Sequence, residues 1–145
     1  MSRMRYIKRW SLMHSTIEEN ISEHTNEVTV IAHALASIGN TYFGKHYNIE
    51  KVLLYAVYHE TSEVITGDLP TPIKYFNQEI NAAYKDLEDR ACRKLLQTLP
   101  EEMRKDYEAA ILPDTASEEY KIVMQQLQNP VFYSVCGNFL EEVNS

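Results

Sequence analysis

The sequence has few of the residues that interrupt regular structure, since its 145 residues include only four glycines and five prolines. A sandwich or barrel built from many short strands needs frequent turns, and glycine and proline are the usual turn residues. Few stretches alternate between apolar and polar residues with the period of two that is typical of a half-buried strand. These absences favour long helices, and the predicted fold class is all-α.

Cysteines and long apolar runs are also scarce. Cys92 and Cys136 are the only two cysteines, and their separation matches no metal or redox motif. We expect buried or half-buried reduced thiols, as in a cytoplasmic protein. The basic N-terminal residues 1–10 are not followed by an apolar run of seven or more residues, so no signal peptide is expected. No stretch approaches the roughly 20 apolar residues of a membrane span, and we expect no membrane partner.

Acidic residues outnumber basic ones, with 21 Asp and Glu against 14 Lys and Arg, which gives a net charge of −7. This balance argues against binding to a nucleic-acid polymer, but a small anionic ligand needs only a local positive site. A length of 145 residues with 44% hydrophobic residues fits one domain, 1–145. Residues 124–145 carry only two charges, Glu141 and Glu142, and the composition of this segment fits a hydrophobic C-terminal element packed on the core.

Apolar residues recur at helical spacing in five stretches. We predict helices from Ser22 to about Phe43, from Ile49 onward to Glu63, from Gln78 to Leu96, from Glu101 to Ile111, and from Thr115 to about Asn129. Ser22 and Asn48 are the expected N-caps of the first two, and Thr115 with Glu118 matches a capping box. Two prolines should break regular structure over Gly67–Pro72.

Polar side chains occur where two of these helices should be apolar. His24 lies four residues before Val28, on the same helical face, and the apolar stripe of the second helix continues into His59, Glu60 and Glu63. Charged residues are rarely buried without a partner, and imidazole and carboxylate are common ligands of divalent metals. A histidine on an apolar face is more often a hydrogen-bonded core residue, and spacing alone leaves both interpretations open.

Four segments, taken together and in order, carry a resemblance to a known family: IKRWSLM, ENISEHTNEV, AVYHETSEVITGDLPTPIKYF and EEYKIV. They are similar to those of the YfbR-type HD-domain 5'-deoxynucleotidases, over about Arg5 to Val123. These enzymes are metal-dependent phosphohydrolases that act on deoxyribonucleoside 5'-monophosphates. The resemblance implies an all-helical HD-domain bundle, a homodimer, and a divalent metal such as Co²⁺ or Mn²⁺.

The resemblance also implies a role for each matching residue. His24, His59 and Glu60 correspond to metal ligands, and Glu63 and Arg9 to catalytic residues. The implied substrate-binding residues are Arg9, Trp10, His24, Asp68, Leu69, Pro70 and Thr71. A planar, permanently charged guanidinium suits a phosphate, because it can donate to two oxygens at once. A carboxylate such as that of Glu63 can accept or relay a proton if it reaches the attacking water.

Each of these residues also has a plainer interpretation. Arg9 could be a surface charge, Trp10 a core residue and Gly67–Pro72 a stiff connector. Lys74 could contact a phosphate, but we expect it to be a solvated surface charge.

The sequence departs from the family pattern in two places. Glu60 stands where the family has aspartate, and its extra methylene displaces the carboxylate by roughly an ångström, which catalysis tolerates poorly. Family members also carry a distal aspartate after the EEYKIV segment, whereas residues 124–145 contain no Asp. Three protein ligands and water can still hold a metal, so we expect weakened metal binding and impaired or absent turnover. We do not expect Glu119 or Glu141 to substitute for the aspartate.

Three hypotheses follow. The leading one is a phosphohydrolase of nucleoside monophosphates. The second is a catalytically inactive HD-fold dimer with a structural or nucleotide-binding role. The third keeps the enzyme class but changes the substrate to a nucleoside triphosphate or a cyclic nucleotide.

Overall fold

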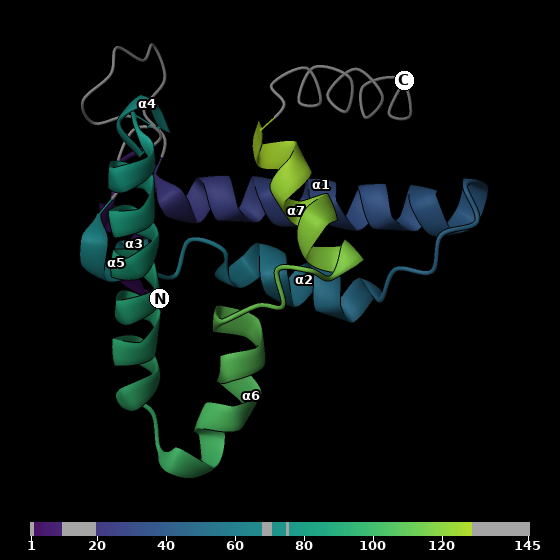
Figure 1. The fold of residues 1–145 in the computed structure, drawn as a ribbon. Helices are drawn as coiled ribbons and strands as arrows, with labels where there is room; N and C mark the ends of the chain where they lie inside the picture. Colours follow the sequence, from purple (N-terminus) through teal and green to yellow (C-terminus); the bar gives the residue numbers. More distant parts are fainter. Residues whose placement is uncertain (1, 10–19, 68–70, 75, 129–145) are drawn as a thin grey trace. The chain divides into compact units, whose positions relative to one another are not determined.

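The protein is all helical in a computed structural model, which describes residues 2–9, 20–67, 71–74 and 76–128 (Figure 1). The elements are the 3₁₀ helix η1 (Ser2–Tyr6) and the helices α1 (Ile21–Tyr42), α2 (Ile49–Tyr58), α3 (Glu63–Thr66), α4 (Thr71–Lys74), α5 (Gln78–Gln97), α6 (Glu101–Ile111) and α7 (Glu118–Gln128). Within the described residues the only extended pairing is one isolated bridge, between Lys8 and Asn20. The predicted all-α class is confirmed.

The chain forms two compact units. The first comprises Met1–Thr25 and Tyr58–Pro113, and the second comprises Asn26–Val57 and Asp114–Ser145.

Helix α1 begins with a reciprocal cap made by Asn20 and Glu23. The Asn20 Oδ1 accepts from the Glu23 N–H at 3.0 Å, and the Asn20 N–H donates to Glu23 Oε2 at 3.2 Å. This is a capping box, which satisfies N–H groups that the first helical turn leaves without partners. The prediction of Ser22 as the N-cap is therefore wrong, because the asparagine two residues earlier has a glutamate at the spacing that closes the box.

Helix α2 is shorter than predicted. Asn48 caps it as expected, accepting from the Lys51 N–H at 3.1 Å. The helix ends at Tyr58, however, and the next residues form turns in which the Thr61 and Glu63 N–H groups donate to carbonyls three residues earlier, at 3.1 Å. A continuous helix to Glu63 is therefore a wrong prediction. Threonine and serine compete with helical hydrogen bonding, and Thr61 is followed by Ser62.

Two further boundaries differ from prediction. Thr71 and Pro72 belong to α4, so the predicted irregular stretch Gly67–Pro72 is wrong for its last two residues. The helix can include Pro72 because proline is tolerated in the first helical turn. At α7 the Ser117 Oγ accepts from the Tyr120 N–H at 3.2 Å, so serine caps this helix in place of the predicted Thr115 box. The fourth predicted helix has the bounds of α6.

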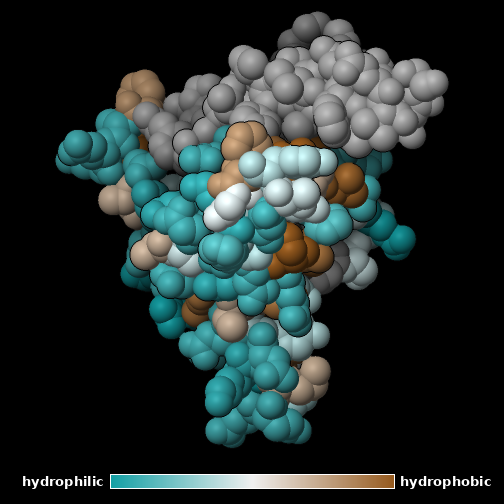
Figure 2. Space-filling model, turned by 90° about the vertical axis from the view of Figure 1, so that its right-hand side faces the viewer, coloured by the Kyte–Doolittle hydropathy of each residue, from teal (hydrophilic) through white to brown (hydrophobic). Residues whose placement is uncertain are grey.

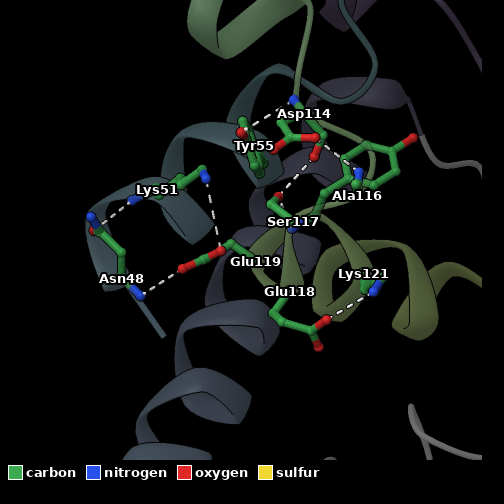
Figure 3. A network of polar contacts seen from close by, with 10 residues as sticks. Asn48, Lys51, Tyr55, Asp114, Ala116, Ser117, Glu118, Glu119 and Lys121 are labelled. Carbon is green, nitrogen blue, oxygen red and sulfur yellow. Dashed lines mark hydrogen bonds and ion pairs between the residues drawn. The ribbon is translucent and has the colours of Figure 1, made fainter. Parts of the chain in front are cut away.

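The second unit has an apolar core between α1, α2 and α7. It consists of Val28, Ala32, Ala36, Val52, Tyr55, Ala56, Ile122 and Val123. Figure 3 shows the polar contacts at its edge, where Glu119 accepts from the Asn48 N–H at 3.1 Å and lies 3.9 Å from the Lys51 ammonium. Glu119 thus supports the start of α2.

The first unit has its own apolar core between α5 and α6. Its buried members are Cys92, Leu96 and Ile111. Burial, with the nearby acidic Glu88 and Asp89, raises the pKa of the Cys92 thiol to about 11, so this cysteine is a protonated core residue. The expectation of a buried thiol is confirmed for Cys92, and Cys136 lies outside the described residues.

Hydrophilic side chains predominate on the face in Figure 2, with smaller hydrophobic areas among them. Exposed ion pairs lie along α5, for example Arg90–Asp86 and Arg93–Asp89, each at 2.8 Å. Across the described ranges, no helix combines the length and the apolar character needed to cross a membrane.

The N-terminus of α5 offers a test of these local rules. Asn77 has extended backbone angles, and its side chain accepts from the Ile80 N–H at 2.8 Å. We expect Asn77→Ala to lower the free energy of unfolding by about 1 kcal/mol, because that N–H loses its partner. Asn77→Asp retains an acceptor and should remain close to the wild type. Equal stabilities of the two variants in urea denaturation would contradict the assigned cap.

Candidate metal and catalytic site

Three potential ligands meet within the first unit. His24 lies in α1, and His59 and Glu60 lie in the turn after α2. The Glu60 Oε1 is 3.2 Å from the His59 Nε2 and 3.8 Å from the His24 Nε2. The potential ligand atoms all lie within 4.8 Å of one another. Ligands about 2.1 Å from a shared ion are separated by roughly 3–3.5 Å, so a small contraction would suffice.

His24 has the environment of a ligand more than that of a core histidine. The residue is 3% exposed, and neither its Nδ1 nor its Nε2 has a hydrogen-bond partner among the described residues. Buried polar atoms normally have a partner, because leaving one unsatisfied costs about 1–3 kcal/mol. Burial, followed by the positive charges of Arg9 and His59, lowers the pKa of His24 to about 3. Its imidazole is therefore neutral near pH 7, as metal coordination requires.

Glu60 supplies the negative charge of this cluster. Burial opposes its ionisation, but hydrogen bonding and charge from His59 outweigh that effect and hold the pKa of Glu60 well below its usual value. The extra methylene relative to aspartate leaves the Glu60 carboxylate within reach of both imidazoles. Two imidazole nitrogens and a carboxylate oxygen fit a divalent metal of borderline softness.

Glu63 lies beside this cluster and is 2% exposed. It is the first residue of α3, and its Oε1 is 3.3 Å from the Lys74 Nζ of α4. The Lys74 side chain is only 19% exposed, so the expectation of a solvated surface charge is wrong. Sequence patterns missed this pair, because the two residues belong to different short helices with irregular chain between them.

Arg9 is placed by contacts between the N-terminal segment and α1. The Ile21 N–H donates to the Ile7 carbonyl at 3.0 Å, and Lys8 bridges to Asn20. The positive charge of Arg9 contributes to lowering the pKa of His24, which places the guanidinium in the electrostatic range of the cluster. The plainer interpretation of Arg9 as a remote surface charge is therefore not favoured.

The other predicted substrate-binding residues are only partly covered by the structure. Thr71 is the first residue of α4. Trp10, Asp68, Leu69 and Pro70 lie outside the described residues.

The structure is similar to solved proteins of the same helical fold. It matches an HD-domain phosphohydrolase from Listeria innocua with a TM-score of 0.75 at 24% identity, over 84% of this chain and 58% of that one. It matches the PH0347 protein from Pyrococcus horikoshii with a TM-score of 0.64 at 22% identity, over 85% of this chain and 65% of that one. The chain thus spans about three fifths of each of these structures, and at such identities the match establishes the fold, an HD-domain helical bundle.

Sequence comparison defines the family more narrowly. A 5'-deoxynucleotidase of Vibrio cholerae is 48% identical over 145 residues, and the 5'-deoxynucleotidase YfbR of Shigella boydii is 44% identical over 143 residues. The chain spans 73% and 70% of these two proteins. The sequence profile of the family described as 5'-deoxynucleotidase YfbR-like matches residues 1–129. The chain belongs to this family.

The metal-ligand assignment predicts a selective loss of binding when His24 is removed. We expect His24→Ala to weaken Mn²⁺ binding by at least about 100-fold, since loss even of groups that only support a ligand costs 10- to 100-fold. His33→Ala is a matched control, because His33 is an exposed histidine in the same helix. Isothermal titration calorimetry on metal-free protein measures both affinities. Equal affinities for His24→Ala and the wild type would contradict the assignment.

Proposed function

We propose that this protein is a metal-dependent 5'-deoxynucleotidase that releases phosphate from deoxyribonucleoside 5'-monophosphates. The observation that carries the proposal is the buried carboxylate of Glu63 beside the His24–His59–Glu60 cluster, in a chain of the YfbR-like family. Curated relatives at 43–48% identity have the name 5'-deoxynucleotidase. A buried acid next to a candidate metal site is an arrangement suited to proton transfer during hydrolysis.

The reaction replaces one phosphorus–oxygen bond with another. Water adds to the phosphorus, the bond to the sugar 5'-oxygen breaks, and that oxygen leaves with a proton. When bound to His24, His59 and Glu60, a divalent metal supplies Lewis-acid polarisation and makes water more acidic. Glu63 would hold or relay the proton at a carboxylate oxygen. Arg9 would neutralise phosphate charge by donating to two of its oxygens.

The selectivity for the sugar is assigned to residues matched by the family resemblance. Trp10 would offer an apolar face to the sugar or base, and Asp68, Leu69, Pro70 and Thr71 would contact the sugar. His24, which the resemblance also matches to a substrate-binding residue, would contact the substrate as well. Close contact of these residues with the deoxyribose would disfavour a 2'-hydroxyl, because the additional oxygen would have to be accommodated and hydrogen bonded.

Three finer assignments belong to the same proposal. Mn²⁺ or Co²⁺ is the proposed ion, because both accept a mixed set of imidazole and carboxylate ligands. The proposed assembly is a homodimer, as the family resemblance implies. The proposed location is the cytoplasm, which agrees with the reduced, buried Cys92.

The catalytically inactive alternative receives no support from the arrangement of the described residues. All three candidate ligands converge, and Glu60 reaches both histidines despite the departure from aspartate. The Asp-free residues 124–145 were the reason for that alternative, and most of them lie outside the described part of the chain. The active phosphohydrolase is therefore the conclusion that the described site supports best.

A substrate panel tests the proposed activity. Purified protein with added Mn²⁺ or Co²⁺ should release phosphate from deoxyribonucleoside 5'-monophosphates, and more slowly from the matching ribonucleotides. Nucleoside triphosphates and cyclic nucleotides should be poor substrates. Absence of phosphate release from every deoxyribonucleotide with either metal would overturn the proposal, and faster hydrolysis of a triphosphate or cyclic nucleotide would change the substrate class.

The role of Glu63 has a separate test. We expect Glu63→Gln to lower kcat by about 10²- to 10⁴-fold, because the amide cannot exchange a proton with the attacking water. The amide retains the shape of the side chain, so Mn²⁺ binding should persist. Glu79→Gln in α5 is the control, since Glu79 is an exposed residue of the same type. An unchanged kcat for Glu63→Gln would remove Glu63 from the mechanism.

A further inference from the structure

Glu63 forms an ion pair with Lys74, a residue to which the proposed mechanism gives no role. The Lys74 Nζ lies 3.3 Å from the Glu63 Oε1, and both side chains are largely removed from solvent. An ion pair in such surroundings is screened less by water than a surface pair, and its geometry is correspondingly more restricted. The contact therefore fixes where the Glu63 carboxylate lies.

The Lys74 ammonium also contacts an aromatic residue of α5. The Nζ of Lys74 lies 4.8 Å from the ring centroid of Tyr84, a distance typical of a cation–π contact. Tyr84 is a buried residue of α5, and both α3 and α4 pack against that helix. The lysine thus links two short helices, one bearing Glu63 and the other bearing Lys74, to the longest helix wholly within the first unit.

The carboxylates near Lys74 keep its largely buried side chain protonated. Burial disfavours its charge, but the carboxylates of Glu63 and Glu60 outweigh that effect and raise the pKa of Lys74 above its usual value. Lys74 is therefore positively charged at neutral pH. Its charge balances the negative charges of Glu63 and Glu60 at the candidate metal site. Because the Lys74 ammonium already contacts both Glu63 and Tyr84, its position suits support of Glu63 better than contact with a phosphate.

We propose that Lys74, seated on the Tyr84 ring, is a positioning residue that holds the Glu63 carboxylate in the orientation needed for proton transfer. This inference rests on the proposed phosphohydrolase function. It assigns to Lys74 an effect on kcat, with little effect on substrate affinity or on metal binding. Misplacement of a catalytic group by about an ångström is enough to lower a rate by up to 10²-fold.

The experiment compares the full chain with Lys74→Met, Lys74→Arg and Lys94→Met. Methionine retains most of the side-chain length without the charge, arginine restores the charge, and Lys94 is an exposed lysine of α5. With a deoxyribonucleoside 5'-monophosphate and Mn²⁺, Lys74→Met should lower kcat by about 10- to 100-fold while KM changes by less than about twofold. Lys74→Arg should recover much of the loss, and Lys94→Met should match the wild type. Tyr84→Leu should lower kcat in the same direction as Lys74→Met, because it removes the ring under the ammonium.

Two measurements that do not depend on turnover accompany the kinetics. Mn²⁺ affinity by calorimetry should be the same in Lys74→Met and the wild type within about threefold. Thermal unfolding of Lys74→Met, Glu63→Gln and the double variant measures the coupling of the two residues. Lys74→Met should lower Tm by about 5 °C or more in the wild-type background, and by clearly less when Glu63 is already glutamine.

Each other outcome overturns the inference in a recognisable way. A raised KM with unchanged kcat would assign Lys74 to substrate binding, and a parallel loss of Mn²⁺ would assign it to the metal site. Equal Tm shifts in both Glu63 backgrounds, or unchanged kcat with unchanged KM, would show that the pair does not act as proposed. If the wild-type protein itself released no phosphate, the proposed function would fail and the positioning role with it, whereas the Tm cycle would still report whether the two residues are coupled.

Discussion

Burial of the His24 imidazole without a hydrogen bond to the described residues is the constraint on which the site depends. Each buried nitrogen without a partner costs of the order of 1–3 kcal/mol, a substantial fraction of the stability of a domain of this size. The pKa of His24, lowered to about 3, shows that protonation does not relieve this cost near neutral pH. A metal ion that accepts the imidazole lone pair would remove this energetic cost. The carboxylate of Glu60 lies close enough to bind the same ion.

The turn after α2 makes the arrangement possible. Consecutive residues in an α-helix point about 100° apart, so His59 and Glu60 could not easily face one point from a continuous helix. By ending α2 at Tyr58, the chain directs both side chains toward His24, whose ring centroid lies 5.4 Å from that of His59. The same turn begins α3 at Glu63, which brings the proposed acid–base residue beside the cluster. One local interruption therefore positions three of the four residues of the central site.

Much of the fold was predictable because helical periodicity is a local property of the sequence. Asn48 as an N-cap and the bounds of α6 were predicted correctly, since both depend on a few neighbouring residues. The end of α2 was not predicted, because the apolar stripe continues beyond the point where Thr61 and Ser62 turn the chain. Among the site residues, His24, His59, Glu60 and Glu63 were found as polar residues on apolar faces. The Lys74–Tyr84 contact was not, because it depends on how α4 packs against α5.

The central claim is that His24, His59 and Glu60 bind one divalent metal ion. Anomalous diffraction from crystals grown with Mn²⁺ or Co²⁺ tests it most directly, because the signal locates the ion independently of the protein atoms. We predict one strong anomalous peak per chain, about 2.0–2.3 Å from a nitrogen of each histidine and an oxygen of Glu60. A peak bound by other residues, or no peak within reach of these three side chains, would contradict the claim.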